Sequence, residues 1–224
     1  MPEKRKLDSA DPRQFEEISH QAKNVLKEGG LIVFPTDTFY GLGADPFNTE
    51  AVKKIFQVKN RAADKALLVL IAKIEDVALL TGAEISSIAK TCMDAFWPGP
   101  LTLLFEARKD LPSELTAGTG KIGIRLPGNA DTCKLISNIG HPLTAPSANL
   151  SGDPEPENIA EIAEEICSQT DLIIDNGPAP GGKASTLLDT TVSPPILLRE
   201  GAVSRAKIES AIGMKCLRRQ MGQE

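Results

Sequence analysis

Two cations one residue apart, Lys59 and Arg61 in "KNR", are of types that can bind an anion. They follow an expected helix, where cations also complement the negative end of the helix dipole. As a phosphate clamp, the lysine would supply a point charge and the arginine a planar fork that suits oxyanions. The pair alone leaves both interpretations open.

Small hydroxyl and amide side chains gather in "PSANLSG", residues 146–152, after an apolar segment. In the simpler interpretation, Asn149 and Ser151 only bond the backbone of a turn. In the other, Ser147 and Asn149 mark the end of a strand, where small side chains let a triphosphate approach backbone N–H groups. This second interpretation predicts an anion site.

Alternation in "KIGIRLP" places Lys121, Gly123 and Arg125 on one side of an expected strand and the apolar residues on the other. A half-exposed strand has the same pattern, but two cations and a glycine on one side also suit an anionic ligand. Two later strands carry Ser185 in "STLLD" and Arg199 in "LLREGA". The serine is a candidate for binding a small polar substrate, whereas a single arginine such as Arg199 most often lies on the surface.

Familiar nucleotide motifs and metal-ligand spacings are absent. The glycine-rich stretch 178–189 lacks the P-loop spacing, and "GLG" at 41–43 is not a dinucleotide fingerprint. His141 has no carboxylate or nucleophile identifiable by spacing, so we interpret it as structural. We predict no metal site built by the protein, and expect any Mg²⁺ to arrive with phosphates.

Composition limits the class of protein. The chain has 224 residues, 41% apolar residues, 4% aromatic residues and a net charge of −5, which argues against a protein that coats nucleic acid. The four cysteines are widely spaced without a CxxC pair, so neither a zinc site nor a disulfide framework is expected. A charged N-terminus and the lack of a long apolar run predict a cytoplasmic protein without a membrane span.

The elements that must position these residues follow from apolar periodicity. Helices are expected over 13–28, 50–58, 74–80, 84–96, 129–139, 157–168 and 204–213, and strands over 31–34, 66–72, 101–107, 121–127, 172–175, 185–191 and 196–200. Asn48 or Thr49 is expected to cap the second helix, and Gly29 with Gly30 to end the first. Late strands follow one another without helices, so we predict an α/β fold with an open mixed sheet covered by helices. Residues 1–224 are expected to form one domain, with a core over about 13–213 and a frayed tail from 215.

Seven segments in order resemble the YrdC family of threonylcarbamoyl-AMP synthases, from about Gly30 to Gly201. They are "PTDTFYGLG", "KNR", "WPGPLT", "IGIRLP", "APSANLSG", "STLLD" and "LLREGA". The resemblance implies a twisted sheet with a concave basic cavity, in a short form of the enzyme without the extra C-terminal domain of longer members. It implies condensation of L-threonine, bicarbonate and ATP to threonylcarbamoyl-AMP and pyrophosphate, for modification of the tRNA adenosine beside the anticodon. Other proteins would transfer the product to tRNA; direct tRNA binding is left open.

The resemblance also assigns site residues. For threonine they are Thr36, Arg125 and Ser185. For ATP they are Lys59, Lys121, Ser147 and Arg199. The catalytic set is Lys59, Arg61, Ser147 and Asn149. Such chemistry needs positioning and charge stabilisation more than a covalent nucleophile.

The chain departs from the family pattern in two places. Ala62 stands where the family has proline, so the loop 61–66 is expected to be more mobile. Glu155 brings a carboxylate close to the expected nucleotide site. Two other functions are weighed: an RNA-binding module that uses the same cavity, and a carbamoyl-transfer domain. The cations lie at motif positions in an acidic chain, and no companion zinc or acylphosphatase module is present, which favours the synthase.

Overall fold

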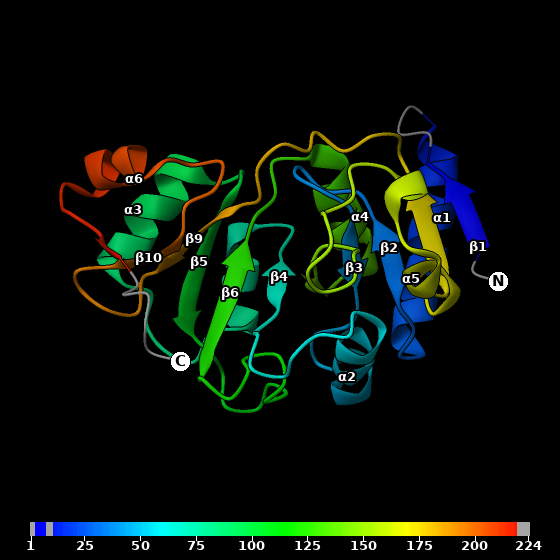
Figure 1. Cartoon of the computed structure of the whole chain (residues 1–224), viewed down its shortest axis with the longest axis horizontal. Coiled ribbons are helices and arrows are strands. Elements are labelled where there is room, and N and C mark those ends of the chain that lie inside the picture. Colours follow the sequence, from blue (N-terminus) through cyan, green and yellow to red (C-terminus); the bar gives the residue numbers. More distant parts are fainter. Residues whose placement is uncertain (1–2, 8–10, 219–224) are drawn as a thin grey trace.

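The strands form two mixed sheets in the computed structural model, which describes residues 3–7 and 11–218 (Figure 1). The first sheet, in the order β1-β8-β2-β3, consists of Glu3–Lys6, Leu172–Asp175, Ile32–Phe34 and Gly41–Gly43. The second, in the order β11-β10-β9-β5-β6-β4-β7, consists of Leu217–Arg218, Ile196–Arg199, Thr186–Asp189, Leu101–Glu106, Lys121–Arg125, Leu68–Leu70 and Leu143–Thr144. Parallel pairs such as β5–β9 adjoin antiparallel pairs such as β5–β6, which confirms the mixed α/β class.

The two sheets meet along β3 and the segment that follows β7. The backbone N–H of Thr144 donates to the carbonyl of Ala44 at 3.1 Å, and that of Leu42 donates to Pro146 at 2.8 Å. The sequence predicts a single open mixed sheet; in the structure the strands are divided between two sheets that this seam of backbone hydrogen bonds joins.

The longer helices begin and end where local chemistry predicts. They are α1 Pro12–Lys27, α2 Thr49–Val58, α3 Ser87–Phe96, α4 Ala130–Ile139 and α6 Arg205–Ile212. Side-chain oxygens accept from the first free N–H groups of all five; they belong to Asp11, Asn48, Ser86, Asn129 and Ser204. Gly29 follows α1 with φ +73°, a conformation that disfavours residues with a Cβ, so the predicted stop of this helix is confirmed.

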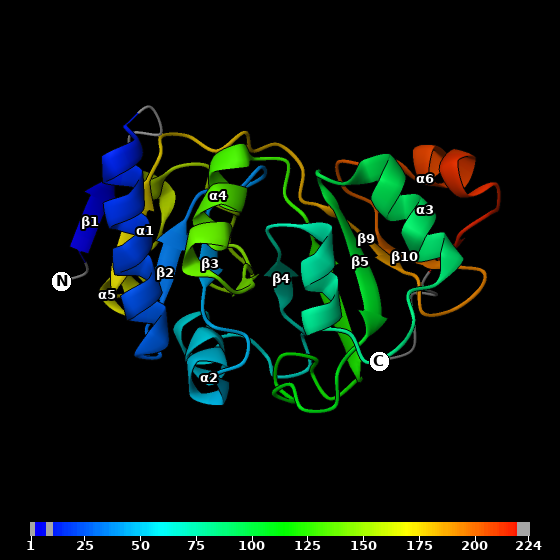
Figure 2. The same cartoon turned by 180° about the vertical axis from the view of Figure 1, so that it is seen from behind.

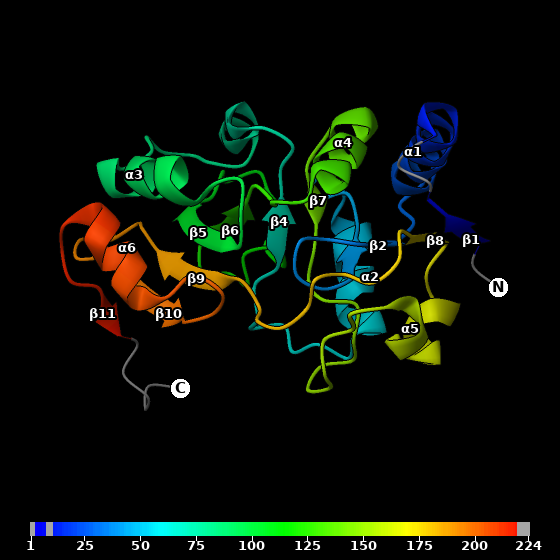
Figure 3. The same ribbon diagram turned by 90° about the horizontal axis from the view of Figure 1, so that it is seen from above.

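Helices cover both sides of the sheets. In Figures 2 and 3, α1, α3 and α4 lie on one side, and the short helix α5 (Glu164–Ser168) lies on the other. The apolar face of α1, with Phe15, Ile18 and Leu26, packs with Leu135 of α4 against the first sheet. Burial of these faces fixes the sheet from which the residues after β2 emerge.

Several elements differ from the sequence prediction. Strands β1, β3 and β11 are not predicted, and β7 corresponds to the strand-like segment that precedes "SAN". The expected helix 157–168 is two pieces, a 3₁₀ turn at Ile159–Glu161 and α5. The break occurs because Ile162 is extended, with φ −76° and ψ 125°. The segment Ile74–Leu79 is a 3₁₀ helix. Leu217 and Arg218 pair with β10, so the tail is not frayed there; residues 219–224 lie outside the described part of the chain.

Candidate active site

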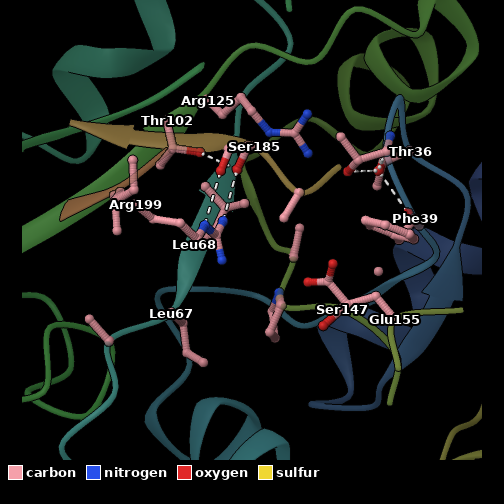
Figure 4. A pocket seen from close by; sticks show the side chains of 18 of the residues that line it. Thr36, Phe39, Leu67, Leu68, Thr102, Arg125, Ser147, Glu155, Ser185 and Arg199 are labelled. Carbon is pink, nitrogen blue, oxygen red and sulfur yellow. Dashed lines mark hydrogen bonds between the residues drawn. The ribbon is translucent and has the colours of Figure 1, made fainter. Parts of the chain in front are cut away.

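A cavity of about 240 Å³ lies between the second sheet and the segments that follow β2 and β7 (Figure 4). Its walls come from β4, β5, β6, β9 and β10 on one side and from Thr36, residues 38–41 and residues 145–147 on the other. Six residues predicted from the sequence line it: Thr36, Arg61, Arg125, Ser147, Ser185 and Arg199. Three other predicted residues, Lys59, Lys121 and Asn149, are outside this lining.

Arg125, at the end of β6, is the buried cation of the cavity. Its side chain is 2% exposed and forms an ion pair with Asp37, whose other oxygen accepts from the Gly128 N–H at 2.9 Å. Burial lowers the pKa of the Arg125 guanidinium, and the Asp37 carboxylate opposes that shift. The Arg125 Nε is buried without a hydrogen-bond partner among the described residues. A buried donor in that condition is costly, so it favours an anionic or carbonyl oxygen as ligand.

Thr36 shapes the wall opposite Arg125. Its hydroxyl donates to the Phe39 carbonyl at 2.7 Å and accepts from the Thr38 N–H at 3.1 Å. These bonds hold the chain in a turn immediately after β2, which is why no helix follows that strand. Figure 4 shows the Arg125 guanidinium extending toward Thr36.

A second polar wall comes from three neighbouring strands of the second sheet. The hydroxyls of Thr102 on β5 and Ser185, just before β9, lie 2.9 Å apart. Arg199 on β10 donates through Nε to the Ser185 carbonyl at 3.1 Å and through Nη2 to its hydroxyl at 3.3 Å. Thr102 was missed by the sequence analysis. The alternation of "LTLLFE" could have placed it on the same sheet face as Leu104, which also lines the cavity.

Lys59 is outside the cavity lining, and its ammonium lies against the backbone of residues 147 and 149. Its ammonium donates to the Asn149 carbonyl at 2.6 Å, to the Asn149 Oδ1 at 3.2 Å and to the Ser147 carbonyl. The Ser147 hydroxyl donates to the same Oδ1 at 2.5 Å. The pKa of Lys59 is lowered to about 8, chiefly by burial and also by the Arg61 charge, while the Glu155 charge opposes the shift. The structure thus brings the two predicted segments "KNR" and "SAN" into direct contact.

Arg61 ties down the loop that precedes β4. Its Nε donates to the Lys65 carbonyl at 3.0 Å and its Nη2 to the Ala66 carbonyl at 2.8 Å.

Lys121 lies outside the cavity lining and pairs with Asp189 at 2.8 Å. Burial raises the pKa of Asp189, but hydrogen bonds from Lys121 and Thr191 outweigh it and hold that pKa below its ordinary value.

The segment between β8 and β9 crosses beside the cavity. The Gly181 N–H donates to the Thr38 carbonyl at 2.7 Å, and a Cβ at Gly181 would lie 2.0 Å from the Glu157 carboxylate. The Glu157 side chain is exposed and could move aside, but Gly181 also has φ +67°, a conformation that favours glycine. The buried Tyr40 hydroxyl donates to the Gly177 carbonyl at 2.5 Å, and burial raises its pKa to about 12.

The structure offers little for metal binding or for catalysis by histidine. No group of three or more His, Cys, Asp or Glu side chains that could hold a metal ion occurs within residues 3–7 and 11–218. His141 is outside the cavity lining, 4.0 Å from Asp45. In the same described residues, no helix is both long and apolar enough to cross a membrane.

Fold and site together define a class: a mixed α/β protein with a polar cavity, lined by arginine and hydroxyl side chains, where two sheets meet. Within it, the chain belongs to the Sua5–YciO–YrdC family, whose family model, described as telomere recombination, matches residues 24–201. The family expected from the seven segments is confirmed.

Three relatives show the extent of the likeness. A threonylcarbamoyl-AMP synthase of Pyrococcus abyssi is 40% identical over 192 residues, covering 86% of this chain and 56% of that protein. One from Bacillus subtilis is 42% identical over 194 residues, with the same two coverages of 86% and 56%. The crystal structure of P. abyssi Sua5 complexed with L-threonine matches with a TM-score of 0.87 and 35% identity, covering 97% of this chain and 62% of that one. The chain thus spans little more than half the length of the two curated relatives.

Proposed function

We propose that this chain is a threonylcarbamoyl-AMP synthase, which condenses L-threonine, bicarbonate and ATP to threonylcarbamoyl-AMP and pyrophosphate. The observation that carries the proposal is the convergence on one cavity of six residues from distant segments, each expected from the family resemblance. The names of the two curated relatives and the threonine complex of P. abyssi Sua5 support it, and favour it over the RNA-binding alternative.

Threonine is assigned to the side of the cavity that holds Arg125. The partnerless Nε of this buried guanidinium is suited to the substrate carboxylate, and Asp37 holds the side chain in place. Thr36 would contact the amino acid through the turn that its hydroxyl organises. Ser185, whose hydroxyl is oriented by Thr102 and Arg199, would contact the substrate from the second sheet.

ATP is assigned to the remaining cations and to the "SAN" segment. Arg61 and Arg199 line the cavity and are suited to phosphate oxygens, and Ser147, which also lines it, is bonded into the network of the buried Lys59. Lys59 and Asn149 would act largely by holding Ser147 in position. For Lys121 to contact the nucleotide, its ion pair with Asp189 would have to open.

The reaction follows from bringing these ligands together. The threonine amine and bicarbonate form N-carboxy-threonine with loss of water. A carboxylate oxygen of that intermediate then bonds to the α-phosphorus of ATP, and the bond to the β-phosphate oxygen breaks to release pyrophosphate. Both partners are anionic, so positioned cations lower the barrier by countering their repulsion and the charge that moves onto pyrophosphate.

The setting of the reaction completes the proposal. Residues 1–224 act as one catalytic domain in the cytoplasm, with Mg²⁺ brought by ATP. The product passes to other proteins that modify the tRNA adenosine beside the anticodon.

The proposal is tested by pyrophosphate release and by the mass of the nucleotide product. We expect release to require threonine, bicarbonate and ATP together, with threonylcarbamoyl-AMP as the product. Omission of threonine is the control. Pyrophosphate release that continues without threonine, or salt-sensitive RNA binding with no ATP turnover, overturns it.

A further inference from the structure

The cavity carries one negative side chain that the proposed reaction does not use. Among the residues that line it, Glu155 is the only acidic one, and it faces a site whose other charges are arginines. The side chain is half-buried, and no described residue donates a hydrogen bond to it or forms a salt bridge with it. Arg125 already has Asp37 as its counter-ion. The Glu155 carboxylate is therefore available to a ligand.

The backbone holds Glu155 in place. It stands between Pro154 and Pro156, and both prolines restrict the backbone dihedrals at this point. The carbonyl of the buried Pro156 accepts from the Tyr40 N–H at 2.9 Å, and the next carbonyl, of Glu157, accepts from the Ala179 N–H at 2.7 Å. The two prolines and these two hydrogen bonds restrict the backbone at Glu155, whose side chain lines the cavity.

Glu155 belongs to the part of the cavity that we assign to ATP. Figure 4 shows it beside Ser147, with Arg125 and Thr36 both farther from it. Its charge raises the pKa of Lys59, whose ammonium bonds the Ser147 carbonyl, so the carboxylate lies within electrostatic reach of that network. A carboxylate next to a triphosphate repels it unless a cation stands between them.

We propose that Glu155 is a protein ligand of the Mg²⁺ ion that accompanies ATP, so that nucleotide binding in this chain depends on the divalent cation. The inference rests on the proposed function. Mg²⁺ keeps several waters and is commonly held by one or two carboxylates together with substrate phosphates, which a single well-placed glutamate provides. Without the ion, Glu155 opposes ATP; with it, Glu155 attracts the complex.

The test compares binding of α,β-methylene-ATP, which cannot release pyrophosphate, in Mg²⁺ and in EDTA by isothermal titration calorimetry. We expect Glu155→Gln to bind the metal-free analogue more tightly and the Mg²⁺ complex more weakly than the original protein. The dissociation constant in EDTA divided by the dissociation constant in Mg²⁺ should therefore fall by roughly tenfold. Glu155→Asp keeps the charge and should retain most of the ratio. Glu165→Gln, which changes an exposed acid on α5 outside the cavity, is the matched control and should leave it unchanged.

Three outcomes separate the ideas. An unchanged ratio in Glu155→Gln overturns the inference while leaving the proposed function intact. A raised KM for threonine with an unchanged ratio also overturns it, because Glu155 would then pair with the substrate ammonium. Failure of the original protein to bind the analogue in Mg²⁺, together with no threonine-dependent pyrophosphate release, overturns the proposed function and the inference with it. Thermal unfolding of each variant, followed by circular dichroism, establishes that it is folded.

Discussion

Asp37 and Arg125 form an ion pair that joins the turn after β2 to the end of β6, so it links the two sheets across the cavity. The two side chains are 11% and 2% exposed, which leaves little solvent to replace either partner. Asp37 thus stabilises the structure around the site, and it also holds Arg125, the arginine that we assign to threonine.

Removal of this counter-ion should destabilise the protein. We expect Asp37→Asn to lower the free energy of unfolding by about 3 kcal/mol, because Arg125 would keep a buried charge without a partner. Urea unfolding measures the change. Asp110→Asn breaks the exposed pair with Arg108 and should cost much less, because solvent screens that pair. Equal, small losses in both variants would show that the Asp37–Arg125 pair is not an important source of stability.

The binding of threonine should depend on the guanidinium group of Arg125. We expect Arg125→Lys to raise the KM for threonine by roughly tenfold or more, because a lysine loses the planar pair of donors. The KM for ATP should change little. Steady-state pyrophosphate release at varied threonine and ATP gives both constants, with Arg108→Lys at an exposed position as the control. A proportional rise in the KM for ATP contradicts the assignment of Arg125 to threonine.

Thr102 should matter through its hydroxyl, which lies 2.9 Å from that of Ser185. We expect Thr102→Val to lower the free energy of unfolding by about 1 kcal/mol and to raise the KM for threonine, because Ser185 loses an orienting partner. Thr190→Val removes a comparable hydrogen bond, to the Leu104 carbonyl at 2.7 Å, from a buried threonine that is not itself part of the cavity lining. It should share the loss of stability and leave the KM unchanged. Equal KM values in both variants would rule out a role for Thr102 in the site.

The buried ammonium of Lys59 gives the protein a pH-dependent contribution to stability. Its pKa is about 8 in the folded protein, below the ordinary 10.5, so between these pH values the unfolded chain holds a proton that the folded protein has released. Stability then rises with pH across that interval, since the unfolded state binds more protons. Below pH 8 both states are protonated and the penalty for burying the charge is present in full.

Lys59→Met isolates that contribution. We expect the unfolding free energy of the original protein, minus that of Lys59→Met, to increase as the pH rises from about 8 to about 10.5. Urea titrations at several pH values measure the difference, and the other titrating groups cancel because both proteins contain them. A difference that stays constant over this range contradicts the lowered pKa.

The sequence predicts the long helices well because their signals are local. A capping oxygen, an apolar stripe and a terminal glycine lie within a few residues of one another, as in α1 between Asp11 and Gly29. Strand β3, by contrast, is "GLG", which has little side-chain pattern to detect. It forms because residues 32–34 pair with it and because Gly41 bridges to Ser147, more than a hundred residues away in sequence.

For the site, the sequence predicts which residue types are present but not how their side chains are oriented. Hydroxyls and cations at the ends of strands indicated correctly which segments meet around the cavity. Sequence patterns could not indicate that Lys59 turns away from the cavity toward two carbonyl groups, or that Lys121 pairs with Asp189 on β9. Those orientations follow from partners that only the folded chain brings near.

The order of strands in the first sheet also constrains when that sheet can form during synthesis. Strand β2, at residues 32–34, lies between β3 and β8, and β8 is made only when residues 172–175 emerge. Most of the chain must therefore leave the ribosome before β2 acquires its parallel neighbour and the turn that carries Thr36 gains a complete support. Such distant pairing slows folding, so we expect nascent chains that end before residue 172 to expose the edge of β2 to chaperones.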